Sequence, residues 1–496
     1  MPRRHRSGVN PSEVLTLMSC LPGSRGVPSA ETTFDRIRTR LLSGVQDPLL
    51  RRAAFALMAI GAGVVPLMAG AANAALQKMP TDGADTLLML IGSALVLLMT
   101  PGLAFFYGGF VRSKNVLNTM MMSFFLMGLI GVLWVVVGYS LAFGTGNPFI
   151  GDFSQFMMNG LGGADGSAPF ADGLAISASS FALFQGMFAI ITPALISGAL
   201  VERVSFKFWF WFCLIWSLVI YSPMAHMVWG GGFLGCLGAV GAIDFAGGTV
   251  VHIASGVAAL VTAMIIGPRT SYPSSTRPPH NVPFILLGAG LLWFGWFGFN
   301  AGSALSANLL ASNAFVNTNT ATAAALLGWI LVEKLRDGKS TTLGAASGAV
   351  AGLVAITPAC GYVNVVGATI IGLVAGAICA LAVRAKFALK LDDALDVGGV
   401  HFVGGVIGAL LIGFFGTKAI GGVNGIFHGG SASLLGNQAL AVVVVAAYSF
   451  IVSWLLAQAI HKTIGFRITE EQEYEGMDTA LHAETAYDFS PGVGAR

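Results

Sequence analysis

The sequence contains few charged residues. Only 10% of its 496 residues are Asp, Glu, Lys or Arg, whereas soluble domains contain roughly 25%. By contrast, 55% are hydrophobic, and the mean hydropathy is +0.77. This composition excludes an ordinary soluble domain and predicts an all-α polytopic membrane protein. The 66 glycines fit closely packed transmembrane helices. The net charge of +3 says little about binding partners, and we expect no nucleic acid.

Cysteine is scarce as well, and enzyme motifs are missing. The five cysteines lack C-x-x-C spacing, so we interpret them as small hydrophobic residues and expect neither a disulfide framework nor a zinc site. The sequence contains no G-x-S-x-G elbow, H-E-x-x-H motif or P-loop. We therefore expect no enzyme activity, no cofactor and no metal.

The N-terminal region differs in composition from the rest. Residues 1–50 are basic and rich in Ser, Pro and Gly, so we expect a disordered leader, or one that is not made because the start is wrongly assigned. A pair of arginines, an apolar run and an A-x-A motif ending at Ala74 follow over residues 51–74. This order predicts a signal peptide cleaved after Ala74. The alternative is an uncleaved first transmembrane helix.

Apolar segments of spanning length fill most of the remaining chain. We expect eleven, each near the roughly 20 residues that cross a bilayer, and a membrane domain over 75–463. They cover residues 85–110, 117–143, 175–200, 206–226, 246–267, 282–302, 313–333, 341–358, 364–383, 397–417 and 437–461.

Basic residues fall in alternate connections between these segments. They are Arg112, Lys114, Arg203, Lys207, Arg269, Arg277, Lys334, Arg336, Lys339, Arg384, Lys386 and Lys390, and the intervening connections contain Lys418 alone. By the positive-inside rule, the N-terminus lies outside after signal cleavage and the tail 464–496 is cytoplasmic.

Two short motifs occur twice and in the same order. I-T-P-A occurs at 191–194 and 356–359, and V-H-x-x-x-G-V at 251–257 and 400–406. Five spans separate the copies, and because five is odd the second copy is inverted. We therefore expect a 5+5 inverted repeat plus one extra helix, with the site near the midplane.

The repeated motif places one histidine in each half. His252 lies 17 residues before Arg269, and His401 lies 17 before Lys418. In antiparallel helices the two imidazoles then meet near the membrane centre. Imidazole both donates and accepts hydrogen bonds, which favours a proton or substrate relay. The alternatives are histidines bonded to backbone carbonyls, and haem or metal ligation.

Aromatic residues gather at the external ends of the same helices. They occur in the stretches 184–188, 225–232 and 294–303. An interfacial aromatic belt is one explanation. A Trp face beside a Ser hydroxyl would also attract a small cation.

The stretches GAIDFAGGTVVH (241–252) and WFGFNAGSA (296–304) closely resemble the ammonium transporter (Amt/Mep/Rh) family, and most of all its bacterial AmtB branch. The similarity runs from about Asp85 to the tail. The resemblance implies a homotrimer of eleven-helix subunits in the bacterial inner membrane, each with a narrow apolar pore for ammonium and methylammonium.

The resemblance also implies roles for individual residues. They are a recruitment site of Phe188, Trp229 and Ser303, a gate of Phe188 and Phe299, pore histidines His252 and His401, and supporting positions Asp244, Trp296, Ser347 and Thr357. From the sequence alone Asp244 precedes Gly-Gly-Thr, so it could cap a helix, attract the cation directly, or do both.

The tail contains an acidic stretch, 467–478. By composition alone it would be a solvated tail. The resemblance implies contact with neighbouring subunits and docking of a PII-type nitrogen regulatory protein.

Dehydration of an ion in an apolar pore predicts the mechanism. An intact ammonium ion would lose its hydration there, at a free-energy cost of several kcal/mol or more. We therefore expect capture of the ion, its deprotonation, passage of ammonia and reprotonation inside. We prefer electrogenic uptake. The alternatives are a Rhesus-type ammonia or carbon dioxide channel, which Trp229 argues against, and an ammonium sensor that signals through a docked protein.

Overall fold

The computed structural model describes residues 81–161, 174–237, 241–270, 272–273 and 278–487. All of them belong to the second of two units into which the chain divides, 75–496. The expected leader, signal peptide and cleavage point lie outside the described residues and stay predictions. Within the described part, the regular elements are helices, which confirms the all-α membrane fold.

Ten helical segments of the described residues are long and apolar enough to cross a membrane. They are α4 (Gly83–Phe110), η2 to α6 (Ser113–Phe143), α7 (Ala178–Leu200), α8 to α9 (Phe206–Val228), η6 to α10 (Gly248–Ile266), α11 (Val282–Gly302), α12 (Leu309–Asp337), α14 to α15 (Val365–Ala388), η7 to α16 (Gly398–Phe415) and α18 (Ser433–Ile464). The remaining predicted segment, 341–358, forms the shorter apolar helix α13 (Thr342–Ile356). The count of eleven crossings therefore stays a prediction.

Polar side chains fix where several helices begin. Asp82 accepts hydrogen bonds from the backbone N–H groups of Ala84 and Asp85 at the start of α4. Asn308 does the same for α12, and Ser177 caps α7. Short acceptors at the N-cap satisfy N–H groups that have no partner inside the helix.

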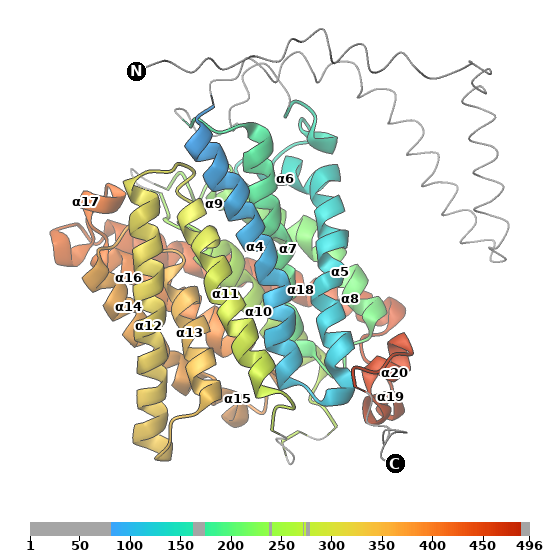
Figure 1. Cartoon of the computed structure of the whole chain (residues 1–496). Helices are drawn as coiled ribbons and strands as arrows, with labels where there is room; N and C mark the ends of the chain where they lie inside the picture. Colours follow the sequence, from blue (N-terminus) through green and yellow to red (C-terminus); the bar gives the residue numbers. More distant parts are fainter. Residues whose placement is uncertain (1–80, 162–173, 238–240, 271, 274–277, 488–496) are drawn as a thin grey trace, which may run out of the picture. The chain divides into compact units, whose positions relative to one another are not determined.

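Glycine allows the helices to pack with backbones almost in contact. In Figure 1, α4 (blue) and α11 (yellow) run side by side, and a Cβ on Gly288 of α11 would lie 2.3 Å from the backbone nitrogen of Phe106 on α4. A Cβ on Gly372 of α14 would lie 2.2 Å from the carbonyl oxygen of Ala321 on α12. Such close packing is how helices associate in lipid.

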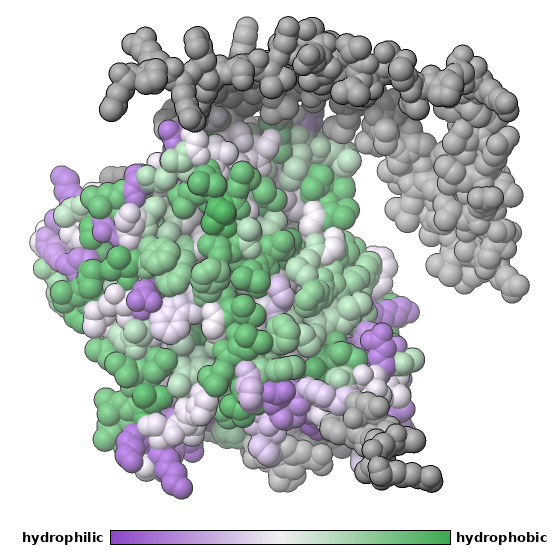
Figure 2. Space-filling view, in the orientation of Figure 1, coloured by the Kyte–Doolittle hydropathy of each residue, from purple (hydrophilic) through white to green (hydrophobic). Residues whose placement is uncertain are grey.

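The surface of the bundle is apolar where lipid would contact it. Figure 2 shows hydrophobic residues over the middle of the visible face, with hydrophilic residues towards its rims. Leu87 of α4 is 59% exposed and Phe294 of α11 is 55% exposed. Exposed apolar area of this extent would be unfavourable in water, and it fits a helix bundle surrounded by lipid.

Both copies of V-H-x-x-x-G-V fold into the same local structure. His252 lies in the π-helical turn η6 (Gly248–Ile253), directly before α10 (Ala254–Ile266). His401 lies in the π-helical turn η7 (Gly398–Phe402), directly before α16 (Val403–Phe415). The two turns contact each other. The duplicated motif therefore has a duplicated structure, and π-helical turns are common at functional sites.

Candidate functional site

The two repeated histidines meet in the interior of the bundle. Nδ1 of His401 lies 3.2 Å from Nδ1 of His252. The ring centroids are 5.3 Å apart with an interplanar angle of 25°, and both side chains are buried. The expectation that the imidazoles meet is confirmed. The alternative of backbone carbonyl partners is wrong for these two nitrogens, because they pair with each other.

Other aromatic rings surround the pair. The His252 ring is 5.3 Å from the Trp296 ring and 6.1 Å from the Phe299 ring, at interplanar angles of 21° and 23°. Nε2 of His252 is buried without a hydrogen-bond partner. Within the described ranges, no group of three or more His, Cys, Asp or Glu side chains could hold a metal ion.

A small apolar cavity runs along these rings, and we call it the narrow cavity. Its volume is about 10 Å³, roughly the space that one water-sized molecule needs. The lining consists of Met99, Leu103, Phe106, Ile191, Leu195, Val251, His252, Leu292, Trp296, Phe299, Val350 and His401. Apart from the imidazoles, the one polar side-chain group among these residues is the Trp296 N–H, which donates to Thr357. The cavity therefore suits a small neutral molecule better than an ion.

A larger hollow, the wide cavity, lies on the other side of an aromatic pair. Its volume is about 340 Å³, and its lining includes Phe188, Trp229, Asp244 and Ser303. The rings of Phe188 and Phe299 are 4.2 Å apart at an angle of 37°. Phe188 lines the wide cavity and Phe299 the narrow one. The two rings therefore lie between the cavities, where the resemblance implies a gate.

The polar atoms of Trp229 and Ser303 are held by the backbone. Trp229 Nε1 donates to the carbonyl oxygen of Asp244 at 2.8 Å. Ser303 Oγ donates to the carbonyl oxygen of Phe299 at 2.8 Å. The indole is thereby oriented, 6.2 Å from the Phe188 ring, and the Ser303 oxygen keeps its lone pairs for a ligand.

Asp244 caps the turn that carries His252. Its Oδ1 accepts from the N–H groups of Gly247 and Gly248, and its Oδ2 accepts from the N–H groups of Thr249 and Val250 and from the Thr249 hydroxyl. Capping, one of the two expected roles, is confirmed. The carboxylate oxygens are occupied by protein donors, so any attraction of a cation acts through space.

The remaining supporting residues lie on α11 and around α13. Trp296 Nε1 donates to Thr357 Oγ1 at 2.8 Å, and Thr357 is the residue at which α13 ends. This bond fixes the indole that stacks on His252. Ser347 is half-buried on α13 and lines neither cavity.

Asp393 is a site residue that sequence reasoning missed. Its carboxylate accepts from the N–H groups of Val397 and Gly398 at 3.0 and 2.7 Å, at the start of the turn that carries His401. It precedes His401 by eight residues, as Asp244 precedes His252. Extending the alignment of the two copies upstream would have found it.

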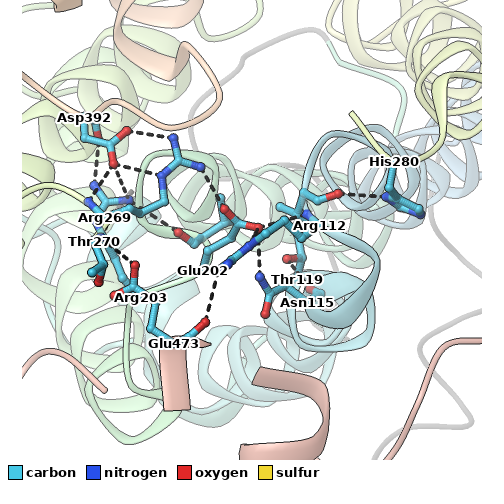
Figure 3. Close-up of polar contacts among 12 residues, drawn as sticks. Arg112, Asn115, Thr119, Glu202, Arg203, Arg269, Thr270, His280, Asp392 and Glu473 are labelled. Atoms are coloured by element: carbon cyan, nitrogen blue, oxygen red, sulfur yellow. Dashed lines mark hydrogen bonds and ion pairs between the residues drawn. The ribbon is translucent and has the colours of Figure 1, made fainter. Parts of the chain in front are cut away.

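A network of ion pairs lies at the end of the bundle where the tail packs (Figure 3). Glu202 accepts from Arg112 Nε at 3.0 Å, Arg269 Nη1 at 2.9 Å and Asn115 Nδ2 at 2.8 Å. Burial alone would raise the pKa of Glu202, but Arg269 and Arg112 outweigh it and lower the pKa to about 2. Arg269 also binds Asp392, through Nη2 at 2.8 Å.

The acidic tail packs onto this network. Glu473 accepts from the N–H of Thr270 at 2.8 Å and from Arg467 Nη2 at 2.6 Å. Asp478 accepts from the N–H groups of Leu117 and Asn118, and so caps α5 (Val116–Leu133). The expectation from composition alone, a solvated tail, is wrong for these acids because helix starts and arginines bind them.

Comparisons with known proteins show the family of this chain. The model of the Ammonium Transporter Family matches residues 87–487. An ammonium transporter of Mycobacterium bovis is 52% identical over 442 residues, which are 84% of this chain and 92% of the relative. One of Bacillus subtilis is 46% identical over 411 residues, 82% of this chain and 99% of the relative.

Solved structures show the same fold. The crystal structure of Candida albicans Mep2 superposes with a TM-score of 0.73 at 36% identity, covering 79% of this chain and 88% of that one. A structure titled Sensor Amt Protein superposes with a TM-score of 0.73 at 31% identity, covering 80% and 98%. The paired buried histidines, the aromatic pair between two cavities and a family match over most of the described residues lead to one conclusion: this chain belongs to the ammonium transporter family.

Proposed function

We propose that the protein takes up ammonium by capturing the ion in the wide cavity and passing ammonia through the narrow cavity. One observation carries the proposal. The Phe188 and Phe299 rings, 4.2 Å apart, separate a hollow of about 340 Å³ from an apolar one of about 10 Å³. Moving an ion between these spaces would strip its hydration, at a cost of several kcal/mol or more.

The wide cavity has the chemistry for capture. The Trp229 face attracts a cation by about 0.5–2 kcal/mol, and the Ser303 oxygen accepts a hydrogen bond from it. Methylammonium presents the same charged end, so we propose it as a second substrate. Potassium has no proton to give up, and it would therefore be stopped at the aromatic pair.

The histidine pair gives the released proton a place in the pore. One Nδ1 donates to the other, so a proton that arrives at His252 can leave from His401 after the rings exchange roles. If the proton crosses as well as ammonia, each transport event moves one positive charge, and uptake is therefore electrogenic. A Rhesus-type channel would pass the neutral gas without this step.

Flux and current measured on the same liposomes test the proposal. Purified protein should take up labelled methylammonium and give a transient current that grows with ammonium concentration, and potassium should give neither. Flux without current would overturn the electrogenic step and favour the gas channel. Absence of both would overturn the transport proposal.

We also propose the cellular setting that the sequence predicts. The protein lies in the bacterial inner membrane as a homotrimer, with its N-terminus outside and its tail in the cytoplasm. The basic residues Arg112, Arg203 and Arg269, at the end where the tail packs, support this orientation. A PII-type regulator would dock at that end. Cross-linking in native membranes and pull-down with the purified regulator test the two assemblies.

A sensor is the second candidate function. It is favoured by the likeness to the structure titled Sensor Amt Protein, and signalling would then run through a docked partner. Growth on limiting ammonium, with and without the gene, separates the two. A growth defect supports transport, whereas normal growth with a lost ammonium response supports sensing.

A further inference from the structure

The wide cavity contains a polar side chain to which no role has been given above. Gln185 of α7 lines this cavity, and its Oε1 is buried with no hydrogen-bond partner. Phe181, Gln185 and Phe188 all line the cavity, and their spacing of four and three residues puts them on one face of the helix. Gln185 therefore lies about one turn from the aromatic pair.

Several other acceptors in the wide cavity are already occupied. The Asp244 carboxylate is occupied by five protein donors. The carbonyl oxygen of Asp244 accepts from Trp229. The Ser303 hydroxyl donates its hydrogen to the carbonyl oxygen of Phe299, and its oxygen keeps its lone pairs. Gln185 Oε1 and Ser303 Oγ are therefore the side-chain oxygens of these named residues that can accept from a ligand.

An unpaired buried amide oxygen destabilises a protein, because it has lost its hydrogen bonds to water. A ligand that donates a hydrogen bond at this place would offset that cost. Ammonium has four N–H donors in tetrahedral directions. Trp229 offers a ring face to one side of the ion, Ser303 offers one oxygen, and a further donor remains for an amide oxygen.

We propose that Gln185 is a binding residue for the ammonium ion, its side chain turning so that the buried Oε1 accepts an N–H in the wide cavity. This inference rests on the proposed function and deepens its capture step. A neutral amide suits the task, because it accepts a hydrogen bond from the ion but is too weak a base to keep the proton. The ion is thus held beside the aromatic pair without losing its ability to deprotonate there.

Two substitutions separate the acceptor from the shape of the side chain. Gln185→Met keeps the length and removes the acceptor, whereas Gln185→Glu keeps an acceptor and adds charge. Gln155→Met is the matched control, because Gln155 Oε1 is also buried without a partner but Gln155 does not line the wide cavity. Protein amount and thermal stability in membranes are measured for each variant.

The readouts are KM and the maximal rate for labelled methylammonium, and the inhibition constant of unlabelled ammonium. Gln185→Met should raise KM and the inhibition constant about tenfold, the effect of losing one hydrogen bond to a charged group, with the maximal rate within about twofold. Gln185→Glu should lower both constants, because a charged acceptor makes the stronger hydrogen bond to the ion. The control should match the wild type.

Unchanged constants in a stable Gln185→Met protein would overturn the inference while transport stands. An equal rise in both Gln185 variants would also overturn it, because the effect would follow shape and not the acceptor. If Gln185→Met does not fold, Gln185→Glu decides, because constants at or above the wild-type values would overturn the inference. No uptake by the wild type would instead overturn the proposed function itself.

Discussion

The Nδ1 atoms of His252 and His401 face each other at 3.2 Å, and this geometry allows one shared proton between them. If both nitrogens carried hydrogen, the two donors would repel, and if neither did, no bond would form. The stacked rings of Trp296 and Phe299 hold His252 in place. The pair therefore has two neutral arrangements, with either ring as the donor. They differ in the tautomer of both rings: the shared Nδ1 proton changes sides, one Nε2 gains a proton and the other Nε2 loses one.

His252→Ala and His401→Ala should each reduce the ammonium-dependent current at least about tenfold, because proton transfer through a positioned group typically contributes a hundredfold or more. Current and labelled methylammonium flux are measured together on liposomes. The exposed His461 provides the control, His461→Ala. Wild-type current in both pore variants would show that the two histidines only pack in the pore and do not transfer the proton.

Trp229→Leu should raise KM for methylammonium about threefold to thirtyfold, because it removes the ring face that attracts the cation. The maximal rate should change less, since the aromatic pair remains. Trp211→Leu is a suitable control, because Trp211 is 43% exposed on the bundle surface. The same KM in Trp229→Leu as in the wild type would contradict the capture role.

Asp244→Asn should lower the thermal stability of the detergent-solubilised protein, by the equivalent of about 1–3 kcal/mol. The amide keeps one acceptor oxygen but places an NH₂ group against backbone donors of the turn that carries His252. Asp393→Asn should have a similar effect at the second copy. Equal melting temperatures in all three proteins would argue against a capping role.

The free energy of unfolding should fall at low pH, because Glu202 then becomes protonated and its ion pairs are lost. The folded-state pKa is lowered from 4.5 to about 2, so between these values the unfolded chain binds a proton that the folded chain does not. The pairing stabilises the folded state fully above about pH 4.5, by roughly 3 kcal/mol, and this is lost as the pH falls towards 2.

Glu202→Gln should therefore lower the melting temperature at pH 7 and flatten its decline between pH 4.5 and 2. Melting curves across that range check the prediction. The exposed Glu475 gives the comparison variant, Glu475→Gln, which should keep the wild-type slope. A wild-type slope in Glu202→Gln would show that other groups carry the effect.

Asp478→Ala should loosen the tail, because it removes the acceptor for the first N–H groups of α5. Loss of an N-cap costs about 1 kcal/mol, enough to increase proteolysis of residues 467–487 severalfold. Limited proteolysis followed by mass spectrometry measures this. Glu475→Ala serves as control, and cleavage at the same rate in both variants would speak against the cap.

Much of the fold could be predicted because its causes are local in the chain. An apolar run of about 20 residues, such as 282–302, becomes a helix in lipid whatever its neighbours are, since its backbone groups have no other partners there. The repeated V-H-x-x-x-G-V motif also identified His252 and His401, because a repeat can be recognised along the chain without knowledge of the packing. Asp393 was missed because its match to Asp244 appears only when the two copies are aligned further upstream.

The sequence by itself determined the membrane class, the helical segments, the duplicated histidines and the family. The tertiary structure alone decided that the two imidazoles share a hydrogen bond across 149 positions of the chain, that Phe188 and Phe299 lie between two cavities, and that Gln185 is left with an unpaired oxygen. The physical reason is that hydropathy acts residue by residue along the chain. Hydrogen-bond partners and cavity walls come from distant segments, and only the packed helices bring these together.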